Sequence, residues 1–218
     1  MLANKLNVLL AERQLSIKEV VEDTGLSRNS ISNISNNVGA NISTDTIDIL
    51  CNYLGITPSD FFEYAPLRIN VESLTNKKEP QIIVKTLQHR KEFSYFYNIV
   101  FKDSDFDEEQ AVRNKEHDLY LDIYTDFSGD DFLEIYQNLP AGFQTDITKK
   151  FITTIEELLN SDFSKNIYAR QNTMDSKIEN LPELLKLINK DKLTLSIKLP
   201  WIDITKVLII KNNIYKIK

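Results

Sequence analysis

Residues 1–64 carry closely spaced signals for helix starts and ends, which restrict this segment to a bundle of short helices. Ser16, Ser27 and Ser43 each precede a stretch with helical apolar spacing, as N-cap residues do. Gly25 and Gly55 stand where a residue with positive φ can end a helix. We predict helices over residues 2–14, 17–23, 28–35 and 44–54, and a short fifth helix opened by Pro58.

The apolar residues of this segment predict which sides of the helices face inward. Ser16 and Glu19 have the spacing of a capping box, in which each side chain accepts a hydrogen bond from the other residue's backbone N–H. The following residues recur at helical spacing and form the expected core: Leu2, Leu6, Leu9, Leu10, Val20, Val21, Leu26, Ile31, Ile34, Ile47, Leu50, Cys51, Leu54, Phe61 and Phe62.

This succession of helices, with the second and third joined at Gly25, resembles the Cro/C1-type (XRE-type) DNA-binding domain of phage and bacterial repressors. The resemblance rests on SIKEVVEDTGLSRNSISNI (16–34), TIDILCNYLGITPSDFF (46–62) and the leucines at positions 6, 9 and 10. It covers residues 1–64 and implies a helix-turn-helix that places its second helix in the major groove of DNA. One departure is that the family's second helix usually begins with a phosphate-contacting Gln, where this chain has Ile17 and Lys18.

The resemblance assigns a role to the polar third helix. Arg28 can pair with a guanine through two hydrogen bonds, and Asn29 and Asn33 can each pair with an adenine. We expect these three residues to read bases. The residues expected to contact phosphates are Lys18, Ser27, Ser30, Asn36 and Asn37. The alternative is that these Ser and Asn side chains are only solvated.

The charge balance of this segment argues against strong DNA binding. Residues 1–66 hold four basic side chains and eight acidic ones, a net charge of −4, and the whole chain has −6. Affinity for DNA normally draws on lysines and arginines that release counterions from phosphates. We therefore expect a weak monomer and a dimer that joins two half-sites.

Beyond residue 66 the apolar pattern changes from helical spacing to alternation. Alternation over 67–71, 81–88, 92–103, 118–127 and 193–204 predicts strands, and 206–218 predicts a hairpin turning at Asn212-Asn213. Helical spacing predicts helices over 129–139, 144–160 and 178–189, the last starting at Pro182. We expect an α+β protein with a five-helix domain at 1–66 and an α+β domain at 67–218 whose sheet is mainly antiparallel.

The C-terminal part offers no recognisable catalytic motif. The acidic stretch 103–110 lacks the glycine and the final glutamate of a calcium loop, with Glu108 and Asn114 in their places. Ala141-Gly142 is the type of bond that self-cleaving repressors cut, but the surroundings of Ser176 do not match their nucleophile and no strand carries the required lysine. The chain is expected to be no enzyme and to need no cofactor or metal.

The C-terminal aromatic residues leave two interpretations open. Residues 67–218 hold nine Phe, seven Tyr and Trp201, which either fill a sheet core or form a surface for self-association or ligand binding. We expect this part of the chain to form a homodimer and to receive a small-molecule or protein inducer. The single cysteine, Cys51, excludes an intrachain disulfide, and no stretch is apolar enough to span a membrane, so a cytoplasmic protein is expected.

These observations together predict a sequence-specific transcriptional regulator, a repressor of phage or mobile-element type that binds an inverted repeat in double-stranded DNA. Two alternatives remain open. One is an antitoxin-like or partner-controlled module in which DNA binding is secondary. The other is an enzyme whose activity lies in the C-terminal domain.

Overall fold

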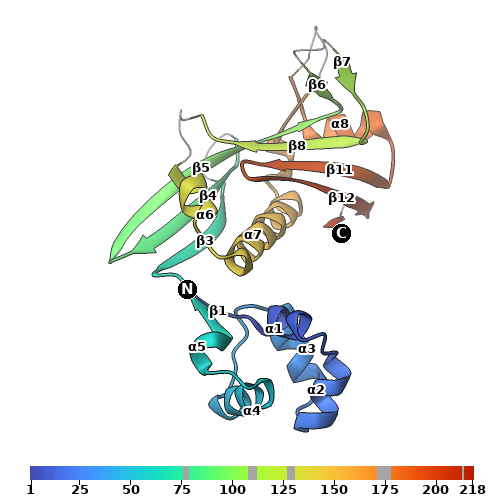
Figure 1. Ribbon diagram of the computed structural model, residues 1–218. Coiled ribbons are helices and arrows are strands. Elements are labelled where there is room, and N and C mark those ends of the chain that lie inside the picture. Colours follow the sequence, from blue (N-terminus) through green and yellow to red (C-terminus); the bar gives the residue numbers. More distant parts are fainter. Residues whose placement is uncertain (76–78, 108–111, 127–130, 171–177, 213) are drawn as a thin grey trace. The chain divides into compact units, whose positions relative to one another are not determined.

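The computed structural model describes residues 1–75, 79–107, 112–126, 131–170, 178–212 and 214–218 (Figure 1). It divides into two compact units. The first comprises Met1–Arg68, Leu87–Lys91 and Asn138–Ile147, and the second comprises Ile69–Thr86, Glu92–Gln137 and Thr148–Lys218. The chain is α+β, as predicted. The domain boundary after residue 66 stays a prediction. No helix in the described ranges is long and apolar enough to cross a membrane.

Short helices make up most of the N-terminal segment. They are α1 (Leu6–Glu12), α2 (Ile17–Thr24), α3 (Arg28–Asn36), α4 (Thr44–Leu54) and α5 (Pro58–Phe61). Four of the five expected helices thus have seven residues or more, whereas α5 is a single turn of four residues. Their core contains most of the residues expected from the spacing, with Leu6, Val20, Ile31, Leu50 and Phe61 at 0% exposure.

The first helix begins later than predicted, at Leu6 rather than Leu2. Leu2 belongs to strand β1 (Leu2–Asn4), which pairs antiparallel with β2 (Phe62–Tyr64), and its side chain is exposed rather than in the core. Asn4 is the last residue of β1: its Oδ1 accepts a hydrogen bond from the Leu6 N–H at the start of α1, and its Nδ2 donates to the Asn37 and Val38 carbonyls. Helical spacing could not reveal this, because the partner of β1 follows the last of the five helices in the sequence.

A curled, mostly antiparallel sheet forms the second unit (Figure 1). Its strands are β3 (Leu67–Leu74), β4 (Gln81–Gln88), β5 (Lys91–Lys102), β8 (Leu119–Tyr124), β9 (Tyr168–Arg170), β10 (Ile178–Asn180), β11 (Lys192–Leu199), β12 (Ile202–Lys211) and β13 (Ile214–Ile217). The order is β10-β9-β5-β8-β11-β12-β13, and β4 joins β5 to β3. Among the strand pairs whose register the structure describes, β5 with β9 and β8 with β11 are parallel.

The remaining elements connect these strands. They are the helices α6 (Asp131–Gln137), α7 (Ala141–Leu159) and α8 (Leu181–Ile188), the short 3₁₀ turn Ser164–Asn166, and the paired strands β6 (Asp105–Asp107) and β7 (Val112–Asn114). The expected single strand over 193–204 is instead two strands that turn at Pro200-Trp201. Ser176 and residues 108–110 of the acidic stretch lie outside the described residues.

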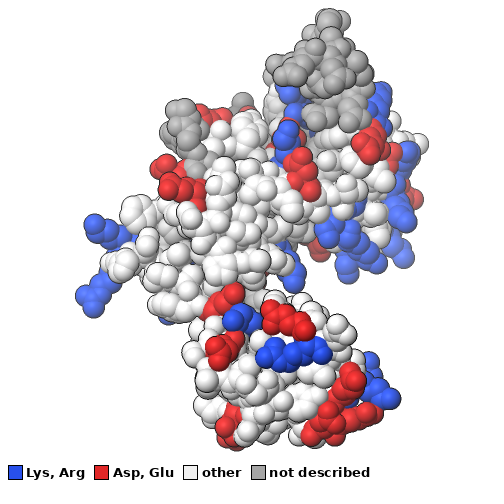
Figure 2. All heavy atoms as spheres, viewed as in Figure 1, with Lys and Arg blue, Asp and Glu red and all other residues white. Residues whose placement is uncertain are grey.

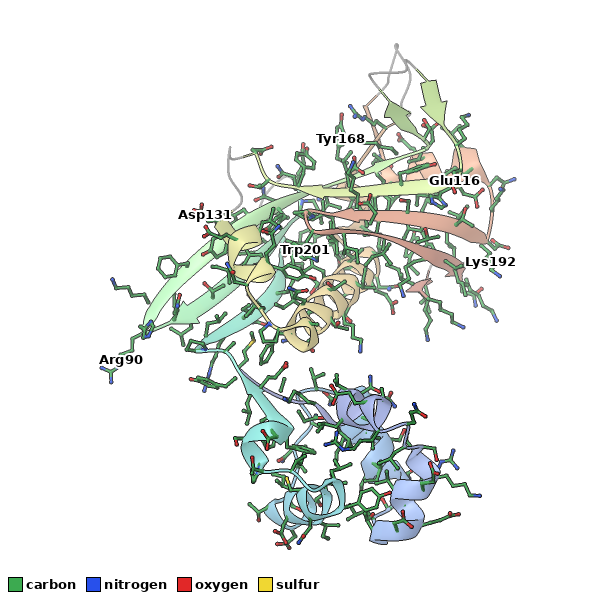
Figure 3. All side chains as sticks on the ribbon, in the orientation of Figure 1. Arg90, Glu116, Asp131, Tyr168, Lys192 and Trp201 are labelled. Atoms are coloured by element: carbon green, nitrogen blue, oxygen red, sulfur yellow. The ribbon has the colours of Figure 1, made fainter. Side chains whose placement is uncertain are left out.

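Aromatic side chains pack around Trp201 in the second unit (Figure 3). The indole stacks on Tyr136 at 4.3 Å between ring centroids and meets Phe151 edge-on at 5.0 Å. Its Nε1–H donates to the Thr148 hydroxyl at 3.2 Å. Tyr97, which also meets the indole edge-on, is fully buried, so the core interpretation holds for these aromatic residues.

The start of the parallel β8–β11 pair is held by Asp118. Its Oδ2 accepts hydrogen bonds from the N–H and the hydroxyl of Thr194, at 2.8 and 2.9 Å. Its Oδ1 accepts from Lys190 Nζ at 2.5 Å. These hydrogen bonds, chiefly that from Lys190, hold the pKa of Asp118 below its usual value. The carboxylate, which directly precedes β8, therefore connects that strand to β11, its distant neighbour in the sequence.

Candidate nucleic-acid interface

The turn between α2 and α3 is built by local hydrogen bonds. Gly25 has φ +71° and ends α2, its N–H donating to the Val21 carbonyl at 3.0 Å. A Cβ on Gly25 would meet nothing within 4 Å, so the positive φ alone requires glycine there. The Thr24 hydroxyl donates to the Val20 carbonyl and accepts from the Leu26 N–H. The turn thus holds the second helix of the pair at a fixed angle to the first.

Both helices of the pair begin with the caps that the sequence predicts. At α2, the Glu19 carboxylate accepts from the Ser16 N–H at 2.7 Å, and the Ser16 hydroxyl accepts from the Glu19 N–H at 3.2 Å. These bonds, the backbone one first, hold the pKa of Glu19 below its usual value. At α3, the Ser27 hydroxyl accepts from the Ser30 N–H at 3.1 Å.

One side of α3 packs into the bundle and the other is open to solvent. Ile31, Ile34 and Ser35 are buried. At about 100° per residue, the direction opposite this buried side falls between Asn29 and Asn33. Both asparagines are exposed, one helical turn apart on one face. The helix therefore presents a polar face with paired donors and acceptors at its centre, an arrangement whose geometry can pair with adenine edges.

All eight predicted interface residues are exposed, and they differ in what already binds them. Among the described residues, Arg28, Asn29 and Asn33 have no side-chain hydrogen bond or ion pair, so their polar atoms are available to a partner. The other five have local contacts: Ser27 with Ser30, Asn36 with Ser32, Asn37 with the Gly39 N–H, and Lys18 with Glu22 at 3.5 Å.

Ser32 is a candidate that the sequence interpretation missed. Its half-buried hydroxyl accepts from Asn36 Nδ2 at 3.2 Å, so it orients an asparagine on the exposed side of α3. On a helix, Ser32 lies one turn after Arg28 and one turn before Asn36. This spacing could have identified Ser32 from the sequence as a neighbour of both interface residues.

Within residues 1–66, carboxylates lie beside two of the four basic side chains, and red and blue spheres alternate on this part of the surface (Figure 2). Arg13 lies 3.7 Å from Glu12, and Lys18 lies beside Glu22. The Asp23 carboxylate accepts a hydrogen bond from the Tyr53 hydroxyl at 2.9 Å, which raises the pKa of that tyrosine. Arg28 is the basic residue of α3, and no carboxylate forms an ion pair with it among the described residues.

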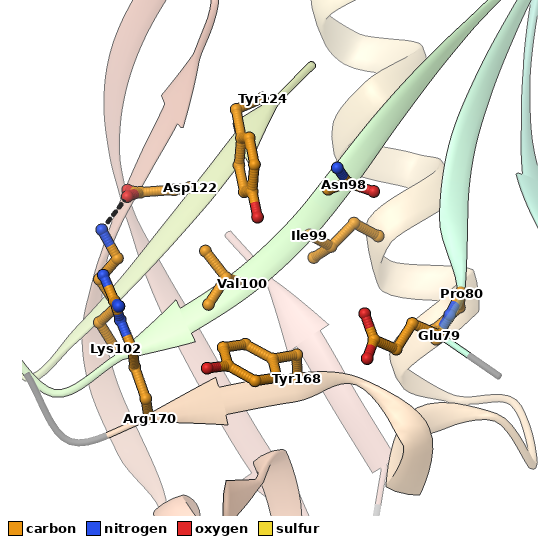
Figure 4. A pocket seen from close by; sticks show the side chains of 10 residues that line it. All are labelled: Glu79, Pro80, Asn98, Ile99, Val100, Lys102, Asp122, Tyr124, Tyr168 and Arg170. Carbon is orange, nitrogen blue, oxygen red and sulfur yellow. Dashed lines mark hydrogen bonds and ion pairs between the residues drawn. The ribbon is translucent and has the colours of Figure 1, made fainter. Parts of the chain in front are cut away.

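A pocket of about 350 Å³ in the second unit is a separate candidate for ligand binding (Figure 4). Lys102 is paired with Asp122 on one of its sides. Arg170 Nε is buried and has no hydrogen-bond partner in the part of the chain that the structure describes. Burial, followed by the charge of Asp126, raises the pKa of Tyr124. In the view of Figure 4, Tyr168 directs its hydroxyl toward Arg170 and Lys102.

The N-terminal geometry is that of a helix-turn-helix DNA-binding module: two capped helices joined at a left-handed glycine, the second with an open polar face. Residues 5–66 match the family model of the Cro/C1-type HTH DNA-binding domain, and this segment is a domain of that type. The rest of the chain matches no family model.

Two further comparisons accompany this match. A solved structure described as that of a "putative DNA-binding protein from Bacteroides fragilis" shares 28% sequence identity, over 29% of this chain and 100% of that chain. Its TM-score is 0.27, which is too low to establish a shared fold. A search of curated proteins gave no match.

Proposed function

We propose that this protein is a sequence-specific transcriptional regulator that binds double-stranded DNA through α3. The observation that carries the proposal is the exposed pair Asn29 and Asn33, which has no hydrogen-bond partner in the described structure and lies opposite the buried side of α3. Asparagine pairs with adenine through a donor and an acceptor together. Arg28, at the N-terminal end of α3, is the matching candidate for a guanine.

The test is a fluorescence-anisotropy titration against the DNA just upstream of the protein's own gene, with a scrambled duplex beside it and at two salt concentrations. Asn29→Ala and Asn33→Ala should each cost about 1–3 kcal/mol of specific binding and leave binding to the scrambled duplex unchanged. Asn7→Ala is the matched control, since Asn7 is an exposed asparagine on α1. Equal losses on both duplexes would remove the base-reading role.

The finer proposal is a cytoplasmic repressor of phage or mobile-element type that binds an inverted repeat as a homodimer through residues 67–218. Its support is the charge of residues 1–66: a domain of net −4 gains affinity when two copies bind adjacent half-sites. Analytical ultracentrifugation of the full chain, alone and with a two-half-site duplex, tests it. A single copy bound to that duplex would contradict it.

The effector pocket is proposed to be the cavity beside Arg170. A buried guanidinium N–H that has no partner among the described residues favours a ligand that carries a carboxylate or phosphate. Inorganic phosphate, acetate and benzoate are suitable probes, and at least one should raise the thermal midpoint of the full chain but not of Arg170→Gln. If none raises the midpoint, or if the variant responds equally, the assignment of the pocket is wrong.

An antitoxin-like protein in which DNA binding is secondary is the competing proposal, and the excess of carboxylates on residues 1–66 favours it. It requires a second polypeptide that co-purifies with this chain in a fixed ratio. It also requires that Asn29→Ala and Asn33→Ala leave the biological activity of the complex intact.

A further inference from the structure

Four lysines project from one face at the end of the C-terminal sheet. The backbone register places Lys192 of β11 opposite Ile209 of β12, and Ile209 opposite Lys216 of β13. Lys211 lies two positions beyond Ile209 on β12, and Lys218 exchanges backbone hydrogen bonds with Val207 at 3.0 Å. Cross-strand partners share a face and alternate positions on a strand share it too, so these four lysines project together.

This group, the lysine face (Lys192, Lys211, Lys216 and Lys218), is open to solvent. All four side chains are exposed. The opposite face of the same strands is apolar, with Leu193, Leu195 and Leu208 at 0% exposure. Lys192 is labelled at the end of β11 in Figure 3, and blue spheres gather over this end of the sheet in Figure 2. In the part of the chain that the structure describes, the side of β11–β13 that carries these lysines therefore presents four solvent-exposed cations.

Among the described residues no carboxylate forms an ion pair with the lysine face, although the Glu156 carboxylate of α7 accepts a hydrogen bond from the Ile217 N–H at the edge of β13. On these three strands, the lysine side carries one carboxylate among the described residues, Asp203, whose cross-strand partner is Lys198 and not a member of the face. Asp118, which directly precedes the neighbouring strand β8, forms an ion pair with Lys190 and not with the lysine face. Residues 190–218 hold seven lysines and two aspartates, a net charge of +5, so the remainder of the chain, at −6 − 5, carries −11.

Protection of the sheet edge does not account for this arrangement. An edge strand resists pairing with other chains when it carries charge of either sign. Here the charges are of one sign, and they extend from the edge strand β13 across β12 to β11. A surface of a single sign attracts a polyelectrolyte of the opposite sign.

We infer that the lysine face binds the phosphate backbone of duplex DNA, independently of sequence. The same chain carries a Cro/C1-type domain, which would hold DNA at a high effective concentration near any second site. That domain has four basic side chains, two of them beside carboxylates, so it offers few cations for phosphates. Lysine is a flexible point charge, suited to phosphates whose exact positions vary.

The spacing of the lysines suits several phosphates at once. Neighbouring strands lie about 4.8 Å apart, so Lys192 and Lys216, separated by one strand, are roughly 10 Å apart at the backbone. Each four-carbon side chain can therefore reach a different phosphate. Each contact should contribute about 0.9 to the slope of log K against log salt.

The experiment compares two quadruple variants of the full chain on a random-sequence duplex over a range of salt concentrations. One variant changes the lysine face (K192Q, K211Q, K216Q and K218Q). The matched control changes four exposed lysines elsewhere (K91Q, K115Q, K149Q and K165Q). Both reach a net charge of −10, by −6 − 4, so a general charge effect would alter both equally.

In the lysine-face variant, the slope of log K against log salt concentration should be smaller in magnitude by roughly 2–4 than in the unaltered protein. In the control variant, this slope should be unchanged. Lysine-to-arginine changes at the same four positions should retain it. Equal slopes for both glutamine variants would overturn the inference. Tighter binding of the unaltered protein to phosphatidylserine vesicles than to DNA, lost in the lysine-face variant, would overturn it in favour of a membrane surface.

Base reading by α3 is not required for this result, because a random-sequence duplex measures backbone contact alone. The two hypotheses can therefore fail separately. Asn29→Ala should change the preference between duplexes and leave the salt slope intact, whereas the lysine-face variant should change the slope and leave the preference intact.

Discussion

At the scale of single residues, Ser27 shows that one side chain can serve both the fold and the proposed interface. Its hydroxyl caps α3 by accepting from the Ser30 N–H, and its position at the helix start is where a phosphate would bind. Ser27→Asp should keep the cap, since aspartate caps as well as serine, but should weaken DNA binding at least about tenfold because its charge faces phosphate. Thermal unfolding and DNA titration of the same samples measure both effects.

Ser27→Ala is the comparison that separates the two roles. It should lower the free energy of unfolding by about 1 kcal/mol, the usual loss when a capping serine is removed, and weaken DNA binding less than the aspartate does. If Ser27→Asp binds DNA as tightly as the unaltered protein, no phosphate lies near the start of α3.

The exposed positions of α3 could be predicted from the sequence, because a cap and the apolar pair Ile31 and Ile34 fix which side packs. The hydrogen bonds of the Asn36 and Asn37 side chains could not be predicted from the sequence. In the folded chain, the Ser32 hydroxyl and the Gly39 N–H bind these two amides and so compete with DNA for them.

At the scale of elements, the capping boxes make helix stability depend on pH. Glu19 and Asp60 accept hydrogen bonds from the caps Ser16 and Thr57, which lower both carboxyl pKa values. A lowered folded pKa means stability that is present at neutral pH, above the ordinary value of about 4, and lost as pH falls through the lowered pKa.

Glu19→Gln should therefore be less stable than the unaltered protein at pH 7, and the difference should shrink as the pH is lowered toward 3 and the glutamate takes up a proton. Thermal melts followed by far-ultraviolet circular dichroism across this range measure the trend. Glu12→Gln, an exposed carboxylate at the end of α1, is the control. A difference that stays constant with pH would show that Glu19 does not act through its charge.

Elements with signals in their own sequence were predicted well, and elements defined by a distant partner were not. The α2 box and the glycine ends of α2 and α4 are local, and all of them are confirmed. Strand β1 was missed because only β2, at the other end of the helical segment, turns Leu2–Asn4 into a strand. The Pro200-Trp201 turn lies within alternating apolar residues and has no glycine or asparagine to mark it.

At the scale of the whole molecule, the single tryptophan gives a probe for one unit. Trp201 lies in the aromatic core of the second unit, so its fluorescence reports the unfolding of that unit. Asp118→Ala should lower the stability seen by fluorescence by about 2 kcal/mol, because it removes charge-assisted hydrogen bonds to Lys190 and Thr194. Urea unfolding followed by fluorescence measures this.

Asp203→Ala is the control for this change, since Asp203 is an exposed carboxylate on β12. It should shift the fluorescence transition little. If both variants shift it equally, the hydrogen bonds of Asp118 contribute nothing beyond those of an exposed charge. The parallel β8–β11 pair that Asp118 starts could not be predicted, because alternation identifies a strand but not its neighbour.

The parallel pairing of β8 with β11 also limits how early a growing chain can assemble its C-terminal sheet. β8 cannot pair with β11 until β11 has been made, so the ribosome must first synthesise the whole stretch from Ile69, where the second unit starts, to Leu199. At roughly 5–20 residues per second, that synthesis takes on the order of 10 s. The helix-turn-helix segment, whose contacts are mostly local, can fold within this interval. The helix-turn-helix surface can therefore form on the nascent chain well before the C-terminal sheet and its lysine face.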